Sequence, residues 1–258
     1  MNIKSLRKAA LAAVAMLASM PCAQAGVTNL LTNGSFENNG GVGQIGNNTT
    51  LAAWSAASGA FINIANGNAD SSGFPTSYGT MYFYGPGNGV SNGFTGSPDG
   101  GSFVASDPGF DPGALSQTVS GLTPGTDYTL SFQWAQAEAY VSQAHRGSTT
   151  SGWQVTLGGE TTSTAVSTLP SWGFANWTTE NFTFTASSAS ETLSFLPIGS
   201  GGTAMALLDG VVLSEYSPPA AVPEPGTMVM AGLLSLGGGI VAVRRGRAKS
   251  KNDATVVA

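Results

Sequence analysis

The feature that most constrains the fold is a set of short segments in which apolar and polar residues alternate. In TDYTLSFQWA, every second residue from Tyr128 to Trp134 is apolar or aromatic, and the residues between them are polar. Similar alternation marks GWQVTLGG, NWTTENFTFTA and ETLSFLP, and AMALLDGVVLSEY ends the region. Because side chains alternate between the two faces of a strand, these segments predict half-buried antiparallel strands. The chain is therefore expected to be all-β, an antiparallel β-sandwich.

Turn residues predict how some segments connect. ALSQTVS and TDYTLSFQWA are separated by GLTPGT, in which Pro124-Gly125 marks a turn, so a hairpin is expected. Residues 38–112 are less regular. Within them, GPGNGVSNGFTGSPDGG has too many glycines for a strand interior and predicts a long loop. With no strict internal repeat, a single folded domain over residues 26–216 is expected.

Residues 1–25 have the organisation of a secretory signal peptide. Basic residues precede an apolar run, and an A-x-A pattern ends at Ala25, so the mature chain is expected to begin at Gly26. One alternative is a retained membrane helix, for which the apolar run is short. Another is lipidation at Cys22, whose preceding residues do not fit a lipoprotein signal. Since Cys22 is the only cysteine, cleavage after Ala25 excludes disulfides from the mature protein.

The C-terminal residues carry a second signal. Residues 217–226 form a proline-rich linker, residues 227–243 an uncharged run, and residues 244–258 a basic tail. The uncharged run is at the short limit for a transmembrane helix, and the basic residues after it are expected to stay cytoplasmic. Taken alone, this pattern fits a plain single-pass anchor.

The same three parts, in this order and spacing, resemble a PEP-CTERM sorting signal. Its motif matches Pro223, Glu224 and Pro225, and its basic pair matches Arg244 and Arg245, although the tail that follows is longer than usual. Such signals occur on exported proteins of Gram-negative bacteria and are processed by exosortase, a membrane cysteine protease or transpeptidase. The resemblance implies export through the inner membrane with transient membrane contact and cleavage near the motif. The product would lie at the cell surface or in the extracellular biofilm matrix.

The exported region is strongly acidic, although the whole chain has a net charge of -5. Between Gly26 and Ala221 there are twelve acidic residues and one basic residue, Arg146, which gives a charge of -11. Such a surface repels phosphate backbones, so nucleic acid is not an expected partner. It suits cations and neutral polar ligands, although acidity also simply keeps an exported protein soluble.

A second resemblance covers almost all of residues 26–216. NLLTNGSFE opens this region, LSQTVSGLTPGTDYTLSFQWA lies within it, and LLDGVVLS closes it. This order is similar to the galactose-binding-like jelly rolls, which include many carbohydrate-binding modules. In several relatives the first and last strands lie side by side and hold a structural Ca²⁺. Glu37 and Asp209 match the acidic positions, so the resemblance implies calcium bound there. Alternatively, the two carboxylates cap turns or accept backbone N–H bonds.

Aromatic residues provide the candidate ligand surface. Sugars present apolar C–H faces that stack on aromatic rings, and their hydroxyls bond to polar side chains. Trp134 and Trp153 lie in alternating strands and are expected in the core, whereas Trp54 lies nearer a loop. The candidate stacking surface comes from PSWGFANW and GTMYFYG and comprises Trp172, Phe174, Trp177, Tyr82 and Tyr84. The alternative is that these rings also pack in the core.

Catalytic patterns are weak. His145 is the only histidine, no G-x-S-x-G elbow is present, and a zinc site would lack further His or Cys ligands. Paired carboxylates for glycoside hydrolysis are defined by their separation in space, so that alternative stands. The sequence predicts a non-catalytic exported domain that binds extracellular polysaccharide. The alternatives are a structural matrix protein without a sugar site and a matrix-remodelling hydrolase.

Overall fold

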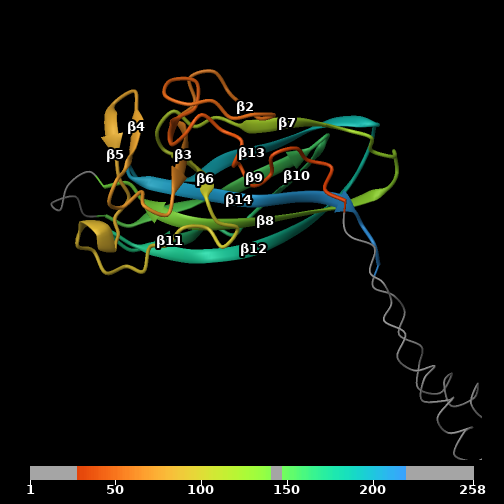
Figure 1. Ribbon diagram of the computed structural model, residues 1–258. Helices are drawn as coiled ribbons and strands as arrows, with labels where there is room; N and C mark the ends of the chain where they lie inside the picture. Colours follow the sequence, from red (N-terminus) through yellow and green to blue (C-terminus); the bar gives the residue numbers. More distant parts are fainter. Residues whose placement is uncertain (1–27, 141–146, 219–258) are drawn as a thin grey trace, which may run out of the picture. The chain divides into compact units, whose positions relative to one another are not determined.

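The computed structural model describes residues 28–140 and 147–218, which fold into strands joined by turns and long loops (Figure 1). The predicted signal peptide, transmembrane helix and basic tail lie outside these residues, as do His145 and Arg146. Contacts divide the chain after Tyr216, and all of the described strands belong to the first unit. Within the described ranges, no helix has the length and apolar character needed to cross a membrane.

The described strands are short at the start of the domain and long toward its end. In chain order they are β1 (Gly43–Gln44), β2 (Ser55–Ala56), β3 (Ile62–Asn66), β4 (Phe74–Thr76), β5 (Gly79–Met81), β6 (Ser102–Ser106), β7 (Leu115–Ser120), β8 (Asp127–Glu138), β9 (Thr149–Leu157), β10 (Glu160–Ser163), β11 (Ser167–Leu169), β12 (Phe174–Thr185), β13 (Ser190–Ser200) and β14 (Ala204–Glu215). A 3-10 helix, η2 (Pro86–Asn88), lies between β5 and β6. The predicted alternating segments coincide with β8, β9, β12, β13 and β14.

Two sheets form the sandwich. The strand order is β1-β3-β6-β14-β8-β12 in the first and β10-β9-β13-β7-β2 in the second, where β11 also pairs with β9. β4 and β5 pair only with each other. The strand pairs are antiparallel throughout these elements. The predicted all-β antiparallel sandwich is confirmed, and its arrangement is consistent with a jelly roll.

One predicted connection is wrong. The sequence predicts a hairpin of β7 and β8, but β7 pairs with β13 and β2, whereas β8 pairs with β14 and β12. The turn between them crosses from one sheet to the other. The N–H groups of Gly121 and Leu122 bond to the carbonyl of Ala189, and that of Gly125 bonds to Ala186. Alternation with a period of two shows which face of a strand is buried, but it does not show to which sheet the strand belongs. Two strands that pack on the core from opposite sheets alternate in the same way as two strands of a hairpin.

The main core lies between the two sheets. β8 contributes its even-numbered residues from Tyr128 to Trp134, and the second sheet contributes Trp153 and Phe195. The ring centroids of Phe132 and Phe195 are 5.2 Å apart with 84° between the planes, an edge-to-face contact. The fully buried Trp153 donates its indole N–H to a backbone carbonyl of β14, so its polar atom is satisfied. Trp134 and Trp153 are therefore core residues, as predicted.

A second apolar layer covers part of the outer face of the six-stranded sheet. On that face, β8 changes from polar residues up to Gln133 to alanines from Ala135 onward, and Ala139 continues the series. The segment 67–101 packs over the alanine half and contributes three phenylalanines. Its backbone approaches closely enough for Phe83 to form a β-bridge with Ala139. The sheet is therefore buried on both faces in this half.

The first described residues run beside the last strand. The N–H of Leu30 bonds to the carbonyl of Leu213, and the N–H of Val211 bonds to the carbonyl of Gly34. The Asn29 side chain adds two bonds to the same strand, since Nδ2 donates to the Val211 carbonyl and Oδ1 accepts from the Leu213 N–H. The opening and closing motifs are therefore adjacent, as the jelly-roll resemblance implies.

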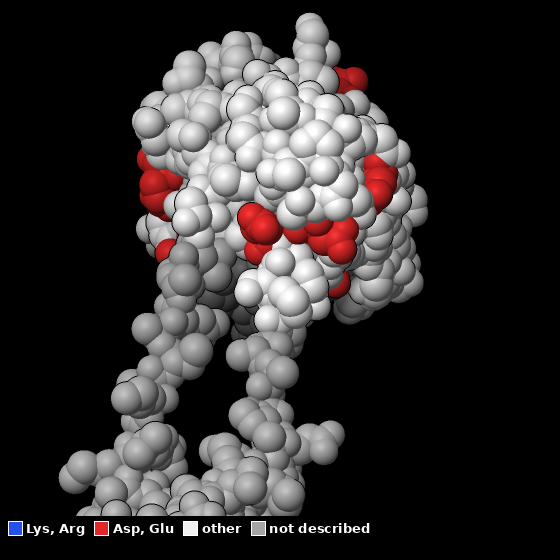
Figure 2. Space-filling model, turned by 90° about the vertical axis from the view of Figure 1, so that its right-hand side faces the viewer, with Lys and Arg blue, Asp and Glu red and all other residues white. Residues whose placement is uncertain are grey.

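The ladder of β8 and β14 defines two ends of the domain. We call the end at which Tyr128 pairs with Glu215, the last residue of β14, the exit end. The opposite end, at which Glu138 pairs with Ala204, is the distal end. Figure 2 views the molecule from the exit end and shows acidic side chains there, with no basic side chain among the described residues in view. The described ranges contain neither lysine nor arginine, so within these ranges no basic side chain offsets the acidic ones.

Candidate functional site

The five aromatic residues of the predicted stacking surface do not form one surface. Trp172 is half-buried, and its ring centroid lies 5.8 Å from that of Tyr84, with 30° between the planes. Tyr84 is fully buried and also contacts the half-buried ring of Tyr140, at 5.1 Å. In contrast to the prediction, Tyr84 supports these rings from within, because a fully buried ring cannot present a face to a ligand.

Phe174 and Trp177 close the outer apolar layer. Their ring centroids lie 5.2 Å from Phe94 and 5.3 Å from Phe103, respectively. Both are half-buried, as is Tyr82. Phe174 and Trp177 thus pack against the protein on one side, which was the alternative expectation, and are partly open to solvent on the other.

The backbone of Trp172 is strained and is fixed by hydrogen bonds. Its φ is +63°, a conformation that costs residues other than glycine on the order of 1–3 kcal/mol. Its N–H donates to the Glu138 carboxylate at 2.5 Å, and its carbonyl accepts from Asn92 Nδ2 at 2.8 Å. Glu138 is only 1% exposed and also accepts the hydroxyl of Thr149 at 3.0 Å. The distal end therefore carries a half-exposed indole whose backbone is fixed on both sides.

Sequence reasoning did not identify Glu138 or Asn92 as supports of Trp172. A signal for Glu138 exists, because Gln136 and Glu138 continue the inward-facing period that begins at Tyr128 and so place two polar residues on the buried face. Buried polar groups need hydrogen-bond partners, and an acidic residue in that register indicates a specific one. Asn92 lies in the glycine-rich loop, where no such periodicity marks it.

The predicted metal ligands, Glu37 and Asp209, lie within electrostatic range of each other. Asp209 is fully buried on β14, at a shift in the pairing with β8. Its Oδ1 accepts the N–H of Gly210 at 2.8 Å, and its Oδ2 has no hydrogen-bond partner in the described part of the chain. Glu37 is exposed, and its Oε1 accepts the N–H of Ser102 at 2.6 Å. Glu37 thus partly matches the expected alternative of a carboxylate that accepts backbone N–H groups, whereas Asp209 keeps one oxygen unused.

The electrostatics around Asp209 are unfavourable for its charged form. The pKa of Asp209 is raised to about 7, mainly by burial and to a smaller extent by the charges of Asp99 and Glu37, whereas the hydroxyl of Ser97 and the N–H of Gly210 act to lower it. The carboxyl groups of Asp99 and Glu37 therefore lie within electrostatic range of Asp209, and the described ranges hold no basic side chain to offset their charges. A bound cation would favour the charged forms, and an all-oxygen donor set suits Ca²⁺.

The residues fit calcium in charge and donor type, with part of the coordination left to other oxygens. Gly101, at φ +59°, gives Glu37 its space, because a Cβ at that position would overlap the Glu37 carboxylate. Within residues 28–140 and 147–218, no three His, Cys, Asp or Glu side chains are gathered tightly enough to hold a metal by themselves. Calcium takes about six to eight oxygens, so backbone carbonyls or a shift of Glu37 would have to complete the site.

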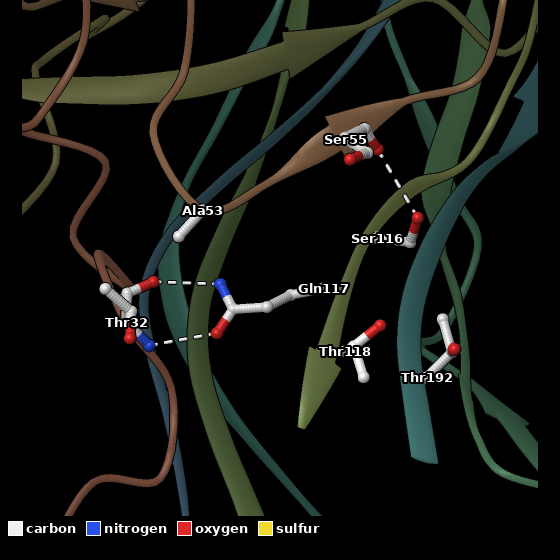
Figure 3. Close-up of a pocket in the computed structure, with 7 residues that line it drawn as sticks. All are labelled: Thr32, Ala53, Ser55, Ser116, Gln117, Thr118 and Thr192. Atoms are coloured by element: carbon white, nitrogen blue, oxygen red, sulfur yellow. Dashed lines mark hydrogen bonds between the residues drawn. The ribbon is translucent and has the colours of Figure 1, made fainter. Parts of the chain in front are cut away.

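A cavity of about 310 Å³ opens beside β2 and β7 (Figure 3). Its lining is rich in hydroxyls, such as those of Ser116, Thr118 and Thr192, and includes no aromatic or acidic side chain. The Gln117 amide is already engaged, since Oε1 accepts from the Thr32 N–H at 2.9 Å and Nε2 donates to the Thr32 carbonyl at 2.8 Å. This cavity can hydrogen-bond a polar molecule but offers neither a stacking face nor a charge.

Comparison with known proteins gives one sequence relative. No family model matches the chain. Halomucin from Haloquadratum walsbyi is 30% identical over 200 residues, which cover 76% of this chain. The chain spans 2% of the length of halomucin, so the similarity concerns a small part of that protein.

Several solved structures of carbohydrate-binding modules are similar in shape. The CBM22-1 xylan-binding domain of Paenibacillus barcinonensis Xyn10C is 13% identical with a TM-score of 0.38, over 76% of this chain and 99% of that one. A CBM61 module in complex with β-1,4-galactotriose is 14% identical with a TM-score of 0.36, over 73% and 99%. A family 16 module is 16% identical with a TM-score of 0.35, over 72% and 100%. These scores are all below 0.5, so the ligands of these modules do not transfer from their shape.

Proposed function

We propose that this chain is an exported, non-catalytic protein that binds extracellular polysaccharide through aromatic side chains at the distal end of its sandwich. In this proposal, exosortase processes the PEP-CTERM-like signal after export through the inner membrane. The domain then works at the cell surface or in the biofilm matrix.

The observation that supports this function most strongly is the presentation of Trp172. Three other tryptophans, Trp54, Trp134 and Trp153, are buried, whereas Trp172 keeps part of its indole exposed on a strained backbone. Core packing requires neither the strain nor the exposure. Strained backbone persists where the surroundings over-determine it and clusters at ligand sites, and the bond to Glu138 supplies that determination. An indole so held can stack on the C–H face of a sugar ring.

Charge narrows the class of polysaccharide. The described residues include all twelve acidic side chains of the exported region and no lysine or arginine. An anionic polymer such as a uronic-acid chain would be repelled by this surface unless cations intervened. A neutral polysaccharide avoids this cost, because its hydroxyls hydrogen-bond to uncharged and acidic groups alike.

A non-catalytic role fits the placement of the carboxyl groups. A glycoside hydrolase needs two carboxyl groups that flank one sugar linkage. Neither the cavity beside β2 and β7 nor a second one near β1, lined by residues 44–47 and 56–60, has an acidic residue in its lining. Asp209, which lies within electrostatic range of Glu37 and Asp99, is fully buried and cannot reach a polymer. A second candidate function is a structural matrix protein without a sugar site. The burial of three of the five tryptophans favours this alternative.

We also propose a structural Ca²⁺ held by Glu37 and Asp209, with charge support from Asp99. Its role would be to join the opening and closing motifs rather than to contact sugar. Thermal melts in calcium and in chelator should differ by several degrees. Identical curves would remove the site from the proposal.

Retention of the purified protein on polysaccharides tests the proposed function. The probes are insoluble neutral polysaccharides and the exopolysaccharide of the host, with and without Ca²⁺. Trp172→Ala and Trp177→Ala should weaken retention without loss of fold. Tyr216→Ala provides the control, because Tyr216 is an exposed aromatic residue at the exit end. If the folded wild type is retained on none of these polymers, the structural matrix protein becomes the better description.

A further inference from the structure

Two exposed aromatic side chains lie together outside the surface described above. Tyr78 is 69% exposed and Phe110 is 42% exposed. Their ring centroids are 5.2 Å apart with 78° between the planes. Both contact the buried ring of Phe61, at 6.1 Å and 5.4 Å, respectively. The Tyr78–Phe110 pair is thus a solvent-facing aromatic surface on a buried aromatic base, assembled from separate segments.

The backbone that presents Tyr78 is fixed. Tyr78 lies in the turn between β4 and β5, and its N–H donates to Thr76 Oγ1 at 3.1 Å. The same hydroxyl donates to the carbonyl of Gly79 at 2.8 Å. The N–H and hydroxyl of Ser77 both donate to Gln44 Oε1, at 2.9 and 2.7 Å. The turn is therefore tied both to itself and to β1.

The loop that presents Phe110 is tied in a similar way. Asp107 Oδ1 accepts the N–H groups of Gly109 and Phe110, at 2.7 and 3.1 Å. The carbonyl of Asp111 accepts the N–H of Phe61 at 2.8 Å, which links the loop to the base of the pair. Because both rings stand on ordered backbone, a ligand that binds them would not have to order the loops first.

A small polar cavity lies next to residues that support the pair. It has a volume of about 310 Å³ and is lined by residues 44–47 and 56–60. Gln44 lines this cavity and accepts the bonds from Ser77, and Ala60 lines it and directly precedes Phe61. The lining offers amides and a hydroxyl but no charged side chain. A stacking surface beside an uncharged polar cavity suits one unit of a neutral sugar polymer.

A second copy of the chain is a poor occupant for this surface. A stable protein interface buries roughly 1,200–2,000 Å² in total, far more than two exposed rings provide. Two copies would also bring acidic surfaces together, with no basic side chain in the described ranges to pair with them. A neutral polymer meets neither obstacle.

The pair lies at the same end of the sandwich as Trp172. Ile62, Ser106, Ala206, Gln136 and Ala175 form one row of paired residues across β3, β6, β14, β8 and β12. Ile62 and Ala175 are the first and last members of this row. Phe61 precedes Ile62 by one residue and Trp172 precedes Ala175 by three, and in this register both lie on the distal side of the row. Four strand spacings of about 4.8 Å place the two sites on the order of 19 Å apart across the sheet.

We propose that the Tyr78–Phe110 pair is a second stacking site for a neutral polysaccharide, and that one chain contacts both this pair and Trp172. This inference rests on the proposed function and adds how the polymer is held. Two linked contacts strengthen binding beyond either one alone, provided the polymer is long enough to reach both. A short oligosaccharide occupies one site at a time and gains nothing from the second.

Affinity electrophoresis and calorimetry of the purified protein test this inference. The probes are xylan, β-1,4-galactan, starch and dextran, each compared with the disaccharide of the same sugar. The variants are Tyr78→Ala/Phe110→Ala, Trp172→Ala and, as an aromatic control at the exit end, Tyr216→Ala. Tyr78→Ser serves as a second variant whose fold is not in question, because Tyr78 is mostly exposed. Circular dichroism and thermal melts establish the fold of each.

The double variant should lose roughly tenfold in affinity for the polymer, and its preference for polymer over disaccharide should fall by a similar factor. Tyr216→Ala should match the wild type. If the wild type binds a polymer and Trp172→Ala weakens that binding, but the double variant and Tyr78→Ser bind as the wild type does, the inference is overturned and the proposed function stands. If the wild type binds no polymer, both are overturned.

Discussion

In the absence of a bound cation, the free energy of unfolding should fall as pH rises from about 4 to about 7. Burial raises the pKa of Asp209 from the ordinary value of 3.8 to about 7. Between these pH values the folded domain keeps a proton on Asp209 that the unfolded chain has released. The contribution of this carboxyl to the free energy of unfolding is therefore fully present below about pH 4 and is lost above about pH 7. A difference of about three pKa units corresponds to roughly 4 kcal/mol.

Asp107 contributes in the same direction over a narrower range. Burial raises the pKa of Asp107 to about 6, although the N–H groups of Gly109 and Phe110 lower it. This carboxyl should account for roughly 3 kcal/mol of the loss, which is complete above pH 6. Asp209→Asn should therefore flatten the curve between pH 6 and 7 and roughly halve its slope between pH 4 and 6, where Asp107 still contributes.

Urea unfolding in chelator at unit steps from pH 4 to 8 measures this dependence. Asp127→Asn is the matched control, because it removes an exposed carboxylate at the exit end. At pH 8, excess Ca²⁺ should restore stability to the wild type and not to Asp209→Asn, because the cation favours the charged form of the carboxyl. A wild-type curve that is flat between pH 6 and 7, or an equal slope in Asp209→Asn, would refute the reasoning.

Three further predictions concern other parts of the chain. Gly101→Ala places a Cβ against the Glu37 carboxylate at a positive φ, so it should cost about 1–2 kcal/mol in urea unfolding and reduce the calcium response; an unchanged response would exclude Glu37 as a ligand. Phe132→Ala should cost about 3–5 kcal/mol, because it empties a fully buried site in contact with Phe195, and a loss under 1 kcal/mol would contradict the packing. Glu224→Ala in the native host should leave the C-terminal segment attached, as read by mass spectrometry of the intact protein; processing at the wild-type level would contradict the PEP-CTERM resemblance.

The strands that sequence predicts well are those with one buried and one polar face. The segment from Tyr128 to Trp134 alternates because its polar residues lie outside the apolar layer that covers the rest of the outer face. β3 and β6 do not alternate, since the main core and the outer layer bury most of their residues on both sides. Trp54 also departs from expectation. It lies just before the two-residue strand β2, but its ring packs against Phe36 in the core.

The candidate site, too, could be predicted from the sequence only in part. The sequence indicates which aromatic residues cluster along the chain, and Trp172 is among them. It does not indicate exposure, because the fold of segment 67–101 decides that. Tyr78 and Tyr84 lie six positions apart in this segment, yet the first is mostly exposed and the second is fully buried. No local pattern separates them, since the burial of Tyr84 depends on β8, far away in sequence.

The interior position of β14 has a mechanical consequence. This strand lies between β6 and β8 and finishes at Glu215, so tension on the chain beyond Tyr216 enters the domain along the axis of β14. If a polymer holds the distal end, the pull runs parallel to the strands. The hydrogen bonds on the two sides of β14 then share the load in shear, instead of parting one after another as they would if the strand were peeled from an edge. Such a domain would resist drag far better along this axis than across it.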